Sequence, residues 1–124
     1  MHRITTGSPF EATMGYSRAV VKGPWCFVSG VTGYDYASMN MPDDVAEQAQ
    51  NCFATIRRVL DEAGFDMGDI VRVQYTVTDA GLVDTIVPVL GAQLGQIRPA
   101  ATMVVAGLIK PEMKIEIEVT ALKE

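Results

Sequence analysis

The sequence has little of what metal sites and nucleic-acid binders need. It contains one histidine, His2, and two cysteines, Cys26 and Cys52, which have neither CxxC nor Cys/His spacing. A zinc site, a histidine-dependent triad and a disulfide framework are therefore not expected. Fifteen acidic residues against ten basic ones give a net charge of -5, which is unsuited to binding phosphates. We expect no metal ion, no cofactor and no nucleic-acid partner.

Long hydrophobic runs are absent as well. No segment reaches the roughly 18 apolar residues typical of a membrane span, and the start, MHRITTGSPF, lacks the apolar stretch of a secretory signal. We therefore expect a cytoplasmic protein without a membrane partner. The 124 residues, 48% hydrophobic and 20% charged, fit one globular domain, residues 1–124.

Periodic patterns predict the elements in the first half of the chain. Two apolar runs around Lys-Gly-Pro predict a β-hairpin over residues 18–31. Acidic residues followed by apolar positions spaced by three and four predict a helix over residues 42–63, which ends at Gly64. The aromatic pair Trp25 and Phe27 is expected in the core, because aromatic side chains at alternating strand positions are usually buried.

The second half predicts a strand, a helix and two further strands. Residues 70–78 alternate, which places Val71, Val73, Tyr75 and Val77 on one side. Residues 80–94 predict a helix although Pro88 opposes it. Residues 101–108 and 114–122 predict the last two strands.

This order predicts an α+β domain, with a mixed sheet of four to six strands and two helices on one face. The other face would combine polar with apolar side chains: Arg72, Gln74, Thr76, Lys114, Glu116 and Glu118 beside Met103 and Val105. Such a face is too apolar for water and too polar for a core. We therefore expect it to pack against other copies of the chain in a closed ring.

Several segments, in this order, are similar to one known family. They are GYSRAV, VSG, AEQAQNCFATIRRVLDEAG, VTD, RPAAT and KIEIEVTAL, and they extend from Tyr16 to Leu122. On these segments the chain resembles the Rid family of reactive intermediate deaminases, also called the YjgF or L-PSP endoribonuclease family. The resemblance implies a chorismate-mutase-like fold and a homotrimer, with a central barrel and small-molecule pockets in the clefts between subunits. It also implies hydrolysis of reactive 2-imino acids to 2-keto acids and ammonia.

The resemblance assigns roles to three residues. Tyr16 and Gly30 match positions of the ligand pocket, and Glu116 matches the catalytic glutamate that positions the attacking water. A polar residue that faces a subunit interface and pairs with Lys114 is the alternative for Glu116. Tyr34 is a further ligand candidate, because it lies in a loop of the kind that lines subunit clefts.

The chain departs from the family at the residue that binds the substrate carboxylate. Active members contain Pro-Ala-Arg followed by Ser or Thr, whereas this chain has Pro99-Ala100-Ala101-Thr102. Ala101 thus replaces the arginine, with Thr102 and Met103 beside it in the expected ligand site, and Met103 replaces a family cysteine. The asparagine that many members have in the second helix is Val87 here.

The missing arginine argues against the standard reaction. Loss of a charged hydrogen bond costs about 1.5 to 3 kcal/mol. Arg98 is the nearest cation, but about 10 Å of extended chain separates it from position 101. A surface arginine is the plainer interpretation of Arg98, and an anion contact is the alternative.

We therefore expect a homotrimer that binds or processes a small metabolite, neutral or cationic, in its subunit clefts. Three alternatives remain open. The first is an imine or enamine deaminase in which another group binds the carboxylate. The second is an endoribonuclease, which the lack of a suitably placed histidine and the negative charge disfavour. The third is a structural or chaperone-like trimer.

Overall fold

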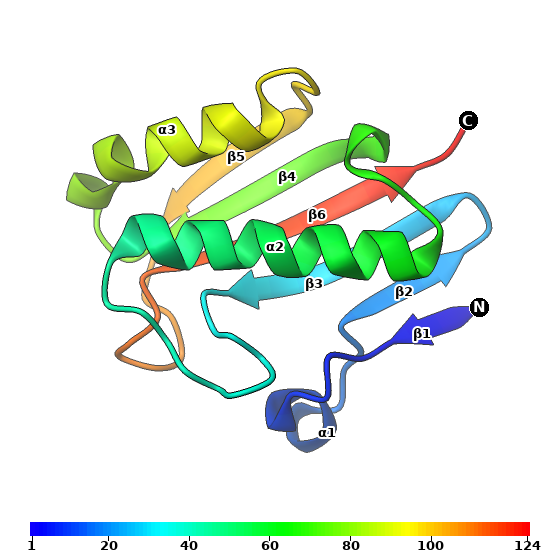
Figure 1. Ribbon diagram of the computed structural model, residues 1–124, viewed down its shortest axis with the longest axis horizontal. Coiled ribbons are helices and arrows are strands. Elements are labelled where there is room, and N and C mark those ends of the chain that lie inside the picture. The colour runs from blue at the N-terminus through cyan, green and yellow to red at the C-terminus, as the bar shows by residue number, and fades with distance from the viewer.

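Six strands form one mixed sheet, in the order β1-β2-β3-β6-β4-β5, in the computed structural model, which describes residues 1–124 (Figure 1). The strands are β1 (His2–Ile4), β2 (Ala19–Lys22), β3 (Trp25–Thr32), β4 (Ile70–Val77), β5 (Ala100–Val105) and β6 (Ile115–Leu122). Strands β4 and β5 are parallel, and the other neighbouring strands are antiparallel. The predicted α+β class and mixed sheet are confirmed.

The helices α2 (Val45–Ala63) and α3 (Val83–Leu94) cover the same face of the sheet (Figure 1). Helix α2 begins where the Asp44 carboxylate accepts a hydrogen bond from the Ala46 N–H, and it ends at Gly64, whose φ of 83° is left-handed. Pro88 lies inside α3 without ending it. A short helix, α1 (Pro9–Met14), and two single 3-10 turns, Met67–Asp69 and Ala80–Leu82, complete the elements.

The hydrophobic core fills the space between these helices and the sheet. Phe53, Ile56 and Leu60 of α2 are fully buried, as are Ile115 and Ile117 of the central strand β6. Both cysteines are free thiols in this core. The N-terminus also belongs to the sheet, because β1 pairs with β2 and buries Ile4. Strand β1 was not predicted from the sequence.

The uncovered face of the sheet differs from the predicted one at strand β5. The parallel register places Thr102 beside Gln74 and Val104 beside Thr76, so these side chains share the uncovered face. Met103 and Val105 lie on the opposite side, and Met103 packs against the core. Their predicted face was wrong, because a shift of one residue moves a strand side chain to the other face.

Two more expectations about burial were wrong. Trp25 and Phe27 are 39% and 47% exposed, not buried, and their rings stack with centroids 5.8 Å apart. Val71 is 42% exposed because the β4–β6 pairing is irregular between Ile70 and Arg72. Apolar side chains thus lie on the surface at several points of the sheet.

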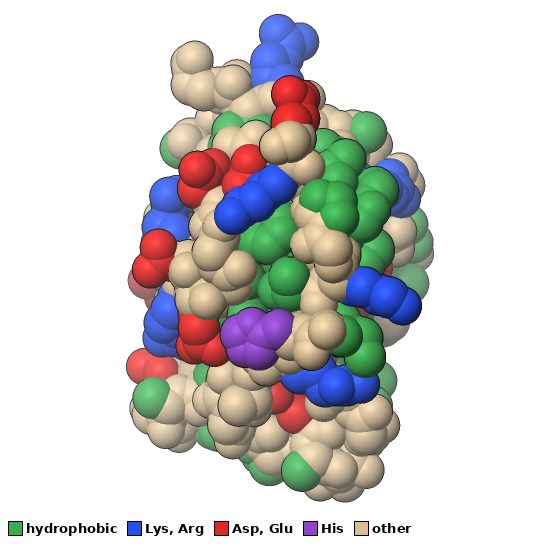
Figure 2. Space-filling view, turned by 90° about the vertical axis from the view of Figure 1, so that its right-hand side faces the viewer, with side chains coloured by type: hydrophobic (Ala, Val, Ile, Leu, Met, Phe, Trp, Pro, Cys, Tyr) green, Lys and Arg blue, Asp and Glu red, His purple; other side chains and the backbone are tan.

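The end of the molecule that contains the β2–β3 turn and the C-terminus shows the same mixture (Figure 2). Hydrophobic side chains gather there between lysines, arginines and carboxylates. Near the C-terminus, Lys123 Nζ lies 4.8 Å from the centre of the Phe65 ring. No helix is both long and apolar enough to cross a membrane.

Candidate functional site

A cavity of about 600 Å³ lies where the bulge of β3, the end of β4 and the loop after β5 meet. We call it the Glu116 pocket; it is lined by Met14, Tyr16, Ser29, Gly30, Thr76, Ala106, Gly107, Leu108, Ile109 and Glu116. It brings together three residues that the sequence analysis selected, Tyr16, Gly30 and Glu116. The apolar wall from Ala106 to Ile109 was not predicted, because the preceding strand was expected to continue to residue 108 but ends at Val105.

A bulge in β3 shapes one wall of this pocket. The pairing of β3 with β6 is interrupted between Val28 and Val31, and Thr32 then pairs with Glu116. Gly30, inside the bulge, lies against the Glu116 side chain: a Cβ at this position would be 2.8 Å from Glu116 Oε1. Glycine is therefore needed for the carboxylate to occupy its place.

The surroundings of Glu116 shift the ionisation of its carboxyl group. Burial raises the pKa of Glu116, the charge of Glu118 raises it further, and the charge of Arg18 opposes both. A carboxyl group whose pKa is moved towards neutral pH is suited to accept and return a proton. Glu116 can also hold a water molecule through its oxygens.

The polar side chain behind the pocket wall is Arg18, which the sequence analysis missed. It is 1% exposed, and its Nη1 donates to the Gly30 carbonyl oxygen at 2.7 Å. Its Nη2 donates to the Tyr16 hydroxyl oxygen at 3.3 Å. One signal in the sequence could have identified Arg18: it is a charged residue directly before the apolar run of β2. A cation that is buried at such a position needs polar partners.

The residues around the missing arginine lie elsewhere on the chain. Ala101, Thr102 and Met103 are on the edge strand β5, opposite residues 73–75 of β4. The pocket begins one residue further along β4, at Thr76, and on the other chain segment only after β5 has ended. Within one chain, none of these three residues lines the Glu116 pocket.

Arg98 and Tyr34 are also outside this pocket. Arg98 is exposed in the turn before β5, where its φ is 54° and its N–H donates to the Leu94 carbonyl oxygen. Tyr34 is 4% exposed, and its hydroxyl donates to Glu112 Oε2 at 2.5 Å. Burial and this bond raise the pKa of Tyr34. Its ring lines a separate, smaller cavity between the 34–36 loop and α2.

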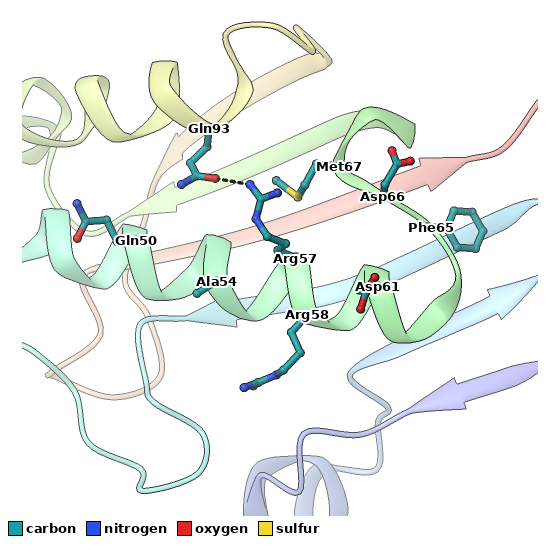
Figure 3. A pocket seen from close by; sticks show the side chains of 9 residues that line it. All are labelled: Gln50, Ala54, Arg57, Arg58, Asp61, Phe65, Asp66, Met67 and Gln93. Atoms are coloured by element: carbon teal, nitrogen blue, oxygen red, sulfur yellow. Dashed lines mark hydrogen bonds between the residues drawn. The ribbon is translucent and has the colours of Figure 1, made fainter.

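A larger cavity, of about 670 Å³, lies outside the sheet, beside α2 (Figure 3). Its charged lining residues are the cations Arg57 and Arg58 and the anions Asp61 and Asp66, all exposed. Arg57 Nη2 donates to Gln93 Oε1 at 3.0 Å, as the figure shows. Because these groups are solvated and balanced in charge, we regard the Glu116 pocket as the candidate site.

Known proteins resemble this chain over almost its whole length. Residues 6–123 match the family model described as Endoribonuclease L-PSP. The crystal structure of a Mycobacterium tuberculosis member of the YjgF/YER057c/UK114 family has a TM-score of 0.90 at 36% identity, and the match covers 98% of each chain. The Escherichia coli YjgF gene product has a TM-score of 0.89 at 26% identity, with 100% of each chain covered. A Rattus norvegicus protein named 2-iminobutanoate/2-iminopropanoate deaminase is 30% identical over 97% of this chain and 88% of its own. Sequence and fold therefore agree with the family predicted above, and this chain belongs to the Endoribonuclease L-PSP family.

Proposed function

We propose that the chain forms a homotrimer whose Glu116 pocket binds a small uncharged or cationic metabolite in clefts between subunits, and that it lacks the standard 2-imino acid deaminase activity. The charge of the pocket supports this most directly. Glu116 is the one ionisable acid or base among the lining residues apart from the tyrosine, and no lysine or arginine is among them.

Electrostatics decides which ligand such a pocket prefers. A carboxylate ligand would meet Glu116 without a cation to compensate, whereas an uncharged or cationic ligand would not be repelled. Ala101 offers only a methyl group where active members have the arginine. The apolar wall, which includes Leu108 and Ile109, suits a short hydrocarbon tail.

Two features of the chain support self-association. The uncovered face exposes the stacked Trp25 and Phe27, and β5 is an edge strand of the sheet. Exposed apolar side chains and a free edge are typical of interfaces. In a trimer, a neighbouring subunit would also bring residues of its edge strand β5, such as Ala101, to a cleft that a single chain leaves open.

The test is release of ammonia or keto acid from a 2-imino acid that an amino acid oxidase generates in the assay. We expect no acceleration by the wild type and measurable acceleration by Ala101→Arg, because an arginine there restores a bidentate partner for the carboxylate. Ala100→Arg is the matched control, since Ala100 is exposed on the same strand but faces the other side. Acceleration by the wild type, or tight binding of 2-oxobutyrate to it, would contradict the proposal.

A second candidate is a deaminase that uses another cation for the carboxylate. The names of two relatives favour it, because bovine and rat proteins called 2-iminobutanoate/2-iminopropanoate deaminase are 27% and 30% identical to this chain. Arg98 is the cation to test. If the wild type is active and Arg98→Ala is inactive, this second candidate replaces the first.

A further inference from the structure

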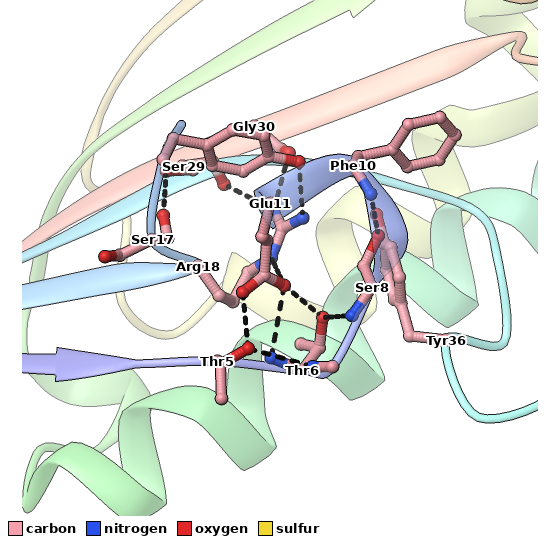
Figure 4. Close-up of polar contacts among 12 residues, drawn as sticks. Thr5, Thr6, Ser8, Phe10, Glu11, Ser17, Arg18, Ser29, Gly30 and Tyr36 are labelled. Carbon is pink, nitrogen blue, oxygen red and sulfur yellow. Dashed lines mark hydrogen bonds and ion pairs between the residues drawn. The ribbon is translucent and has the colours of Figure 1, made fainter. Parts of the chain in front are cut away.

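Arg18 is the largest of the fully buried side chains and lies behind the Glu116 pocket. Figure 4 shows its guanidinium group among Glu11, Ser29 and Gly30. Through the bonds to the Gly30 carbonyl and the Tyr16 hydroxyl, one side chain holds two residues of the pocket wall. The position of both therefore depends on Arg18.

The hydrogen bond from Arg18 determines whether the Tyr16 hydroxyl acts as a donor or as an acceptor towards the pocket. A guanidinium group has only donors, so Arg18 uses a lone pair of the Tyr16 oxygen and leaves the tyrosine's own proton free. The hydroxyl makes no other hydrogen bond within the chain. Its proton is thus available to an acceptor in the pocket, and donation from a cation to its oxygen strengthens the O–H as a donor.

Ion pairing alone does not explain this orientation of Arg18. Its Nε lies 3.8 Å from Glu11 Oε2 and has no hydrogen-bond partner, although it is buried. Glu11 is 6% exposed and accepts instead from Thr5 and Thr6. An unsatisfied buried donor is costly, so the guanidinium is oriented towards Gly30 and Tyr16 at the expense of its bond to Glu11.

The same contacts prevent Arg18 from binding an anionic ligand directly. Its charge is neutralised by Glu11, and both of its terminal nitrogens donate to protein groups. Because it lies behind Tyr16 and Gly30 and is 1% exposed, it does not offer a free fork to a carboxylate.

We propose that Arg18 is a positioning residue of the Glu116 pocket: it fixes the Tyr16 hydroxyl as a donor to a ligand that presents an uncharged acceptor, a carbonyl oxygen or an imine nitrogen. The inference rests on the proposed function, because it takes this pocket as the ligand site, and it narrows the ligand class. Glu116 supplies the complementary group, which accepts a hydrogen bond from a water molecule or from the ligand.

A purely structural role for Arg18 makes a different prediction. Ser29 and Gly30 lie in the β3 bulge, and Arg18 Nη1 contacts both of their carbonyl oxygens, at 3.4 and 2.7 Å. If capping these carbonyls were its whole role, Arg18 would affect stability but not the ionisation or ligand contacts of Tyr16. Measurements on Tyr16 therefore distinguish the structural role of Arg18 from its positioning role.

The first experiment follows the ionisation of Tyr16 by carbon NMR of ring-labelled tyrosine in the alkaline range. Tyr16→Phe identifies its signal among those of four tyrosines. Burial raises the pKa of Tyr16, and Arg18 opposes this more strongly than Glu11 adds to it. In Arg18→Gln/Glu11→Gln, which removes both buried charges together, we expect the pKa of Tyr16 to rise further. In Arg18→Lys, which keeps the positive charge, we expect the pKa of Tyr16 to rise less than in the double variant. No movement in the double variant overturns the proposal, whether or not a ligand binds.

The second experiment compares two probes with one carbon skeleton, uncharged 2-oxobutanamide and anionic 2-oxobutyrate. We expect the wild type to bind the amide more tightly, and both Tyr16→Phe and the double variant to bind it about three- to tenfold more weakly. Unchanged binding of the amide by Tyr16→Phe overturns the proposal. If neither probe binds the wild type while Arg18 still shifts the ionisation of Tyr16, both the proposed function and the proposed ligand class are wrong. Only the interaction between Arg18 and Tyr16 is then supported.

Discussion

Two buried polar side chains, Gln48 and Arg18, connect distant parts of this chain in contrasting ways. Gln48 is 0% exposed; its Nε2 donates to the carbonyl oxygens of Pro42 and Glu112, at 2.7 and 3.0 Å, and its Oε1 accepts from the Lys114 N–H at 3.0 Å. It is uncharged, both of its N–H groups and its oxygen are used, and none of its partners lines the Glu116 pocket.

Arg18 is equally buried but differs in each of these respects. It is charged, its Nε has no hydrogen-bond partner, and all three of its hydrogen-bond partners, Tyr16, Ser29 and Gly30, line the pocket. Fully satisfied polar networks fix one structure, whereas local rules are typically broken at functional sites. The comparison indicates that Gln48 serves the fold, by attaching α2 to the turn before β6, and that Arg18 serves the pocket.

The largest effect on stability is expected from Gln48→Leu. The substitution leaves two carbonyl groups and one N–H without partners in the interior, which should lower the free energy of unfolding by about 4 kcal/mol. Urea denaturation measures this loss. Gln50→Leu, at an exposed position of the same helix, is the matched control and should change stability by less than about 0.5 kcal/mol. Equal effects of the two substitutions would contradict the structural role of Gln48.

The next effect is expected from Arg18→Gln, which leaves Glu11 buried without its cation. Loss of one partner of a buried pair should cost about 3 kcal/mol, and adding Glu11→Gln should recover part of it. Burial alone would raise the pKa of Glu11, but the bonds from Thr5 and Thr6 and the charge of Arg18 hold it below its usual value. The stability that Glu11 contributes is therefore present at neutral pH and is lost as the pH falls through its folded-state pKa.

Urea denaturation as a function of pH checks this second prediction. The difference between wild type and Arg18→Gln should shrink as the pH falls and Glu11 becomes protonated in both proteins. Arg3→Gln, at an exposed position of β1, removes the same charge from the surface and should have little effect at any pH. A loss that is independent of pH would mean that Arg18 stabilises the fold mainly through the bulge carbonyls.

A smaller effect, confined to the pocket, is expected from Gly30→Ala. The new Cβ would lie 2.8 Å from Glu116 Oε1, so the flexible carboxylate has to move while the backbone stays in place. Stability should change by no more than about 1 kcal/mol, and binding of 2-oxobutanamide should weaken about tenfold. Gly91→Ala, in α3 with open space around the added methyl, is the control and should leave binding unchanged. Unaltered binding by Gly30→Ala would show that the carboxylate position is not critical.

The sequence alone was enough to predict the α+β class, the mixed sheet, the two covering helices and three of the residues that line the Glu116 pocket. Hydrophobic periodicity determined α2 and the alternating strand β6, and the family segments identified Tyr16, Gly30 and Glu116. Arg18 could not be found in this way, because its value depends on contacts with residues 11, 16 and 30, which no local pattern brings together. The faces of Val71 and Met103 failed for a related reason, since a bulge or a strand start moves alternation by one residue.

The smallest effect, and the one that connects the pocket to pH, is expected from Glu116→Gln. Because burial and Glu118 raise the folded-state pKa of Glu116, the ionised carboxylate costs folding free energy above that pKa. The uncharged amide should therefore stabilise the chain at neutral pH, by less than about 1 kcal/mol because the side chain is partly solvated. The gain in stability should vanish below the unfolded-state pKa of glutamate, near 4.5, where both side chains are uncharged.

Glu62→Gln, at an exposed position of α2, makes the same change in net charge and is the control for Glu116→Gln. If Glu116→Gln is less stable than wild type at neutral pH, attraction between Glu116 and Arg18 outweighs burial. The pocket would then hold a compensated carboxylate, and the preference for uncharged ligands would rest on Ala101 alone.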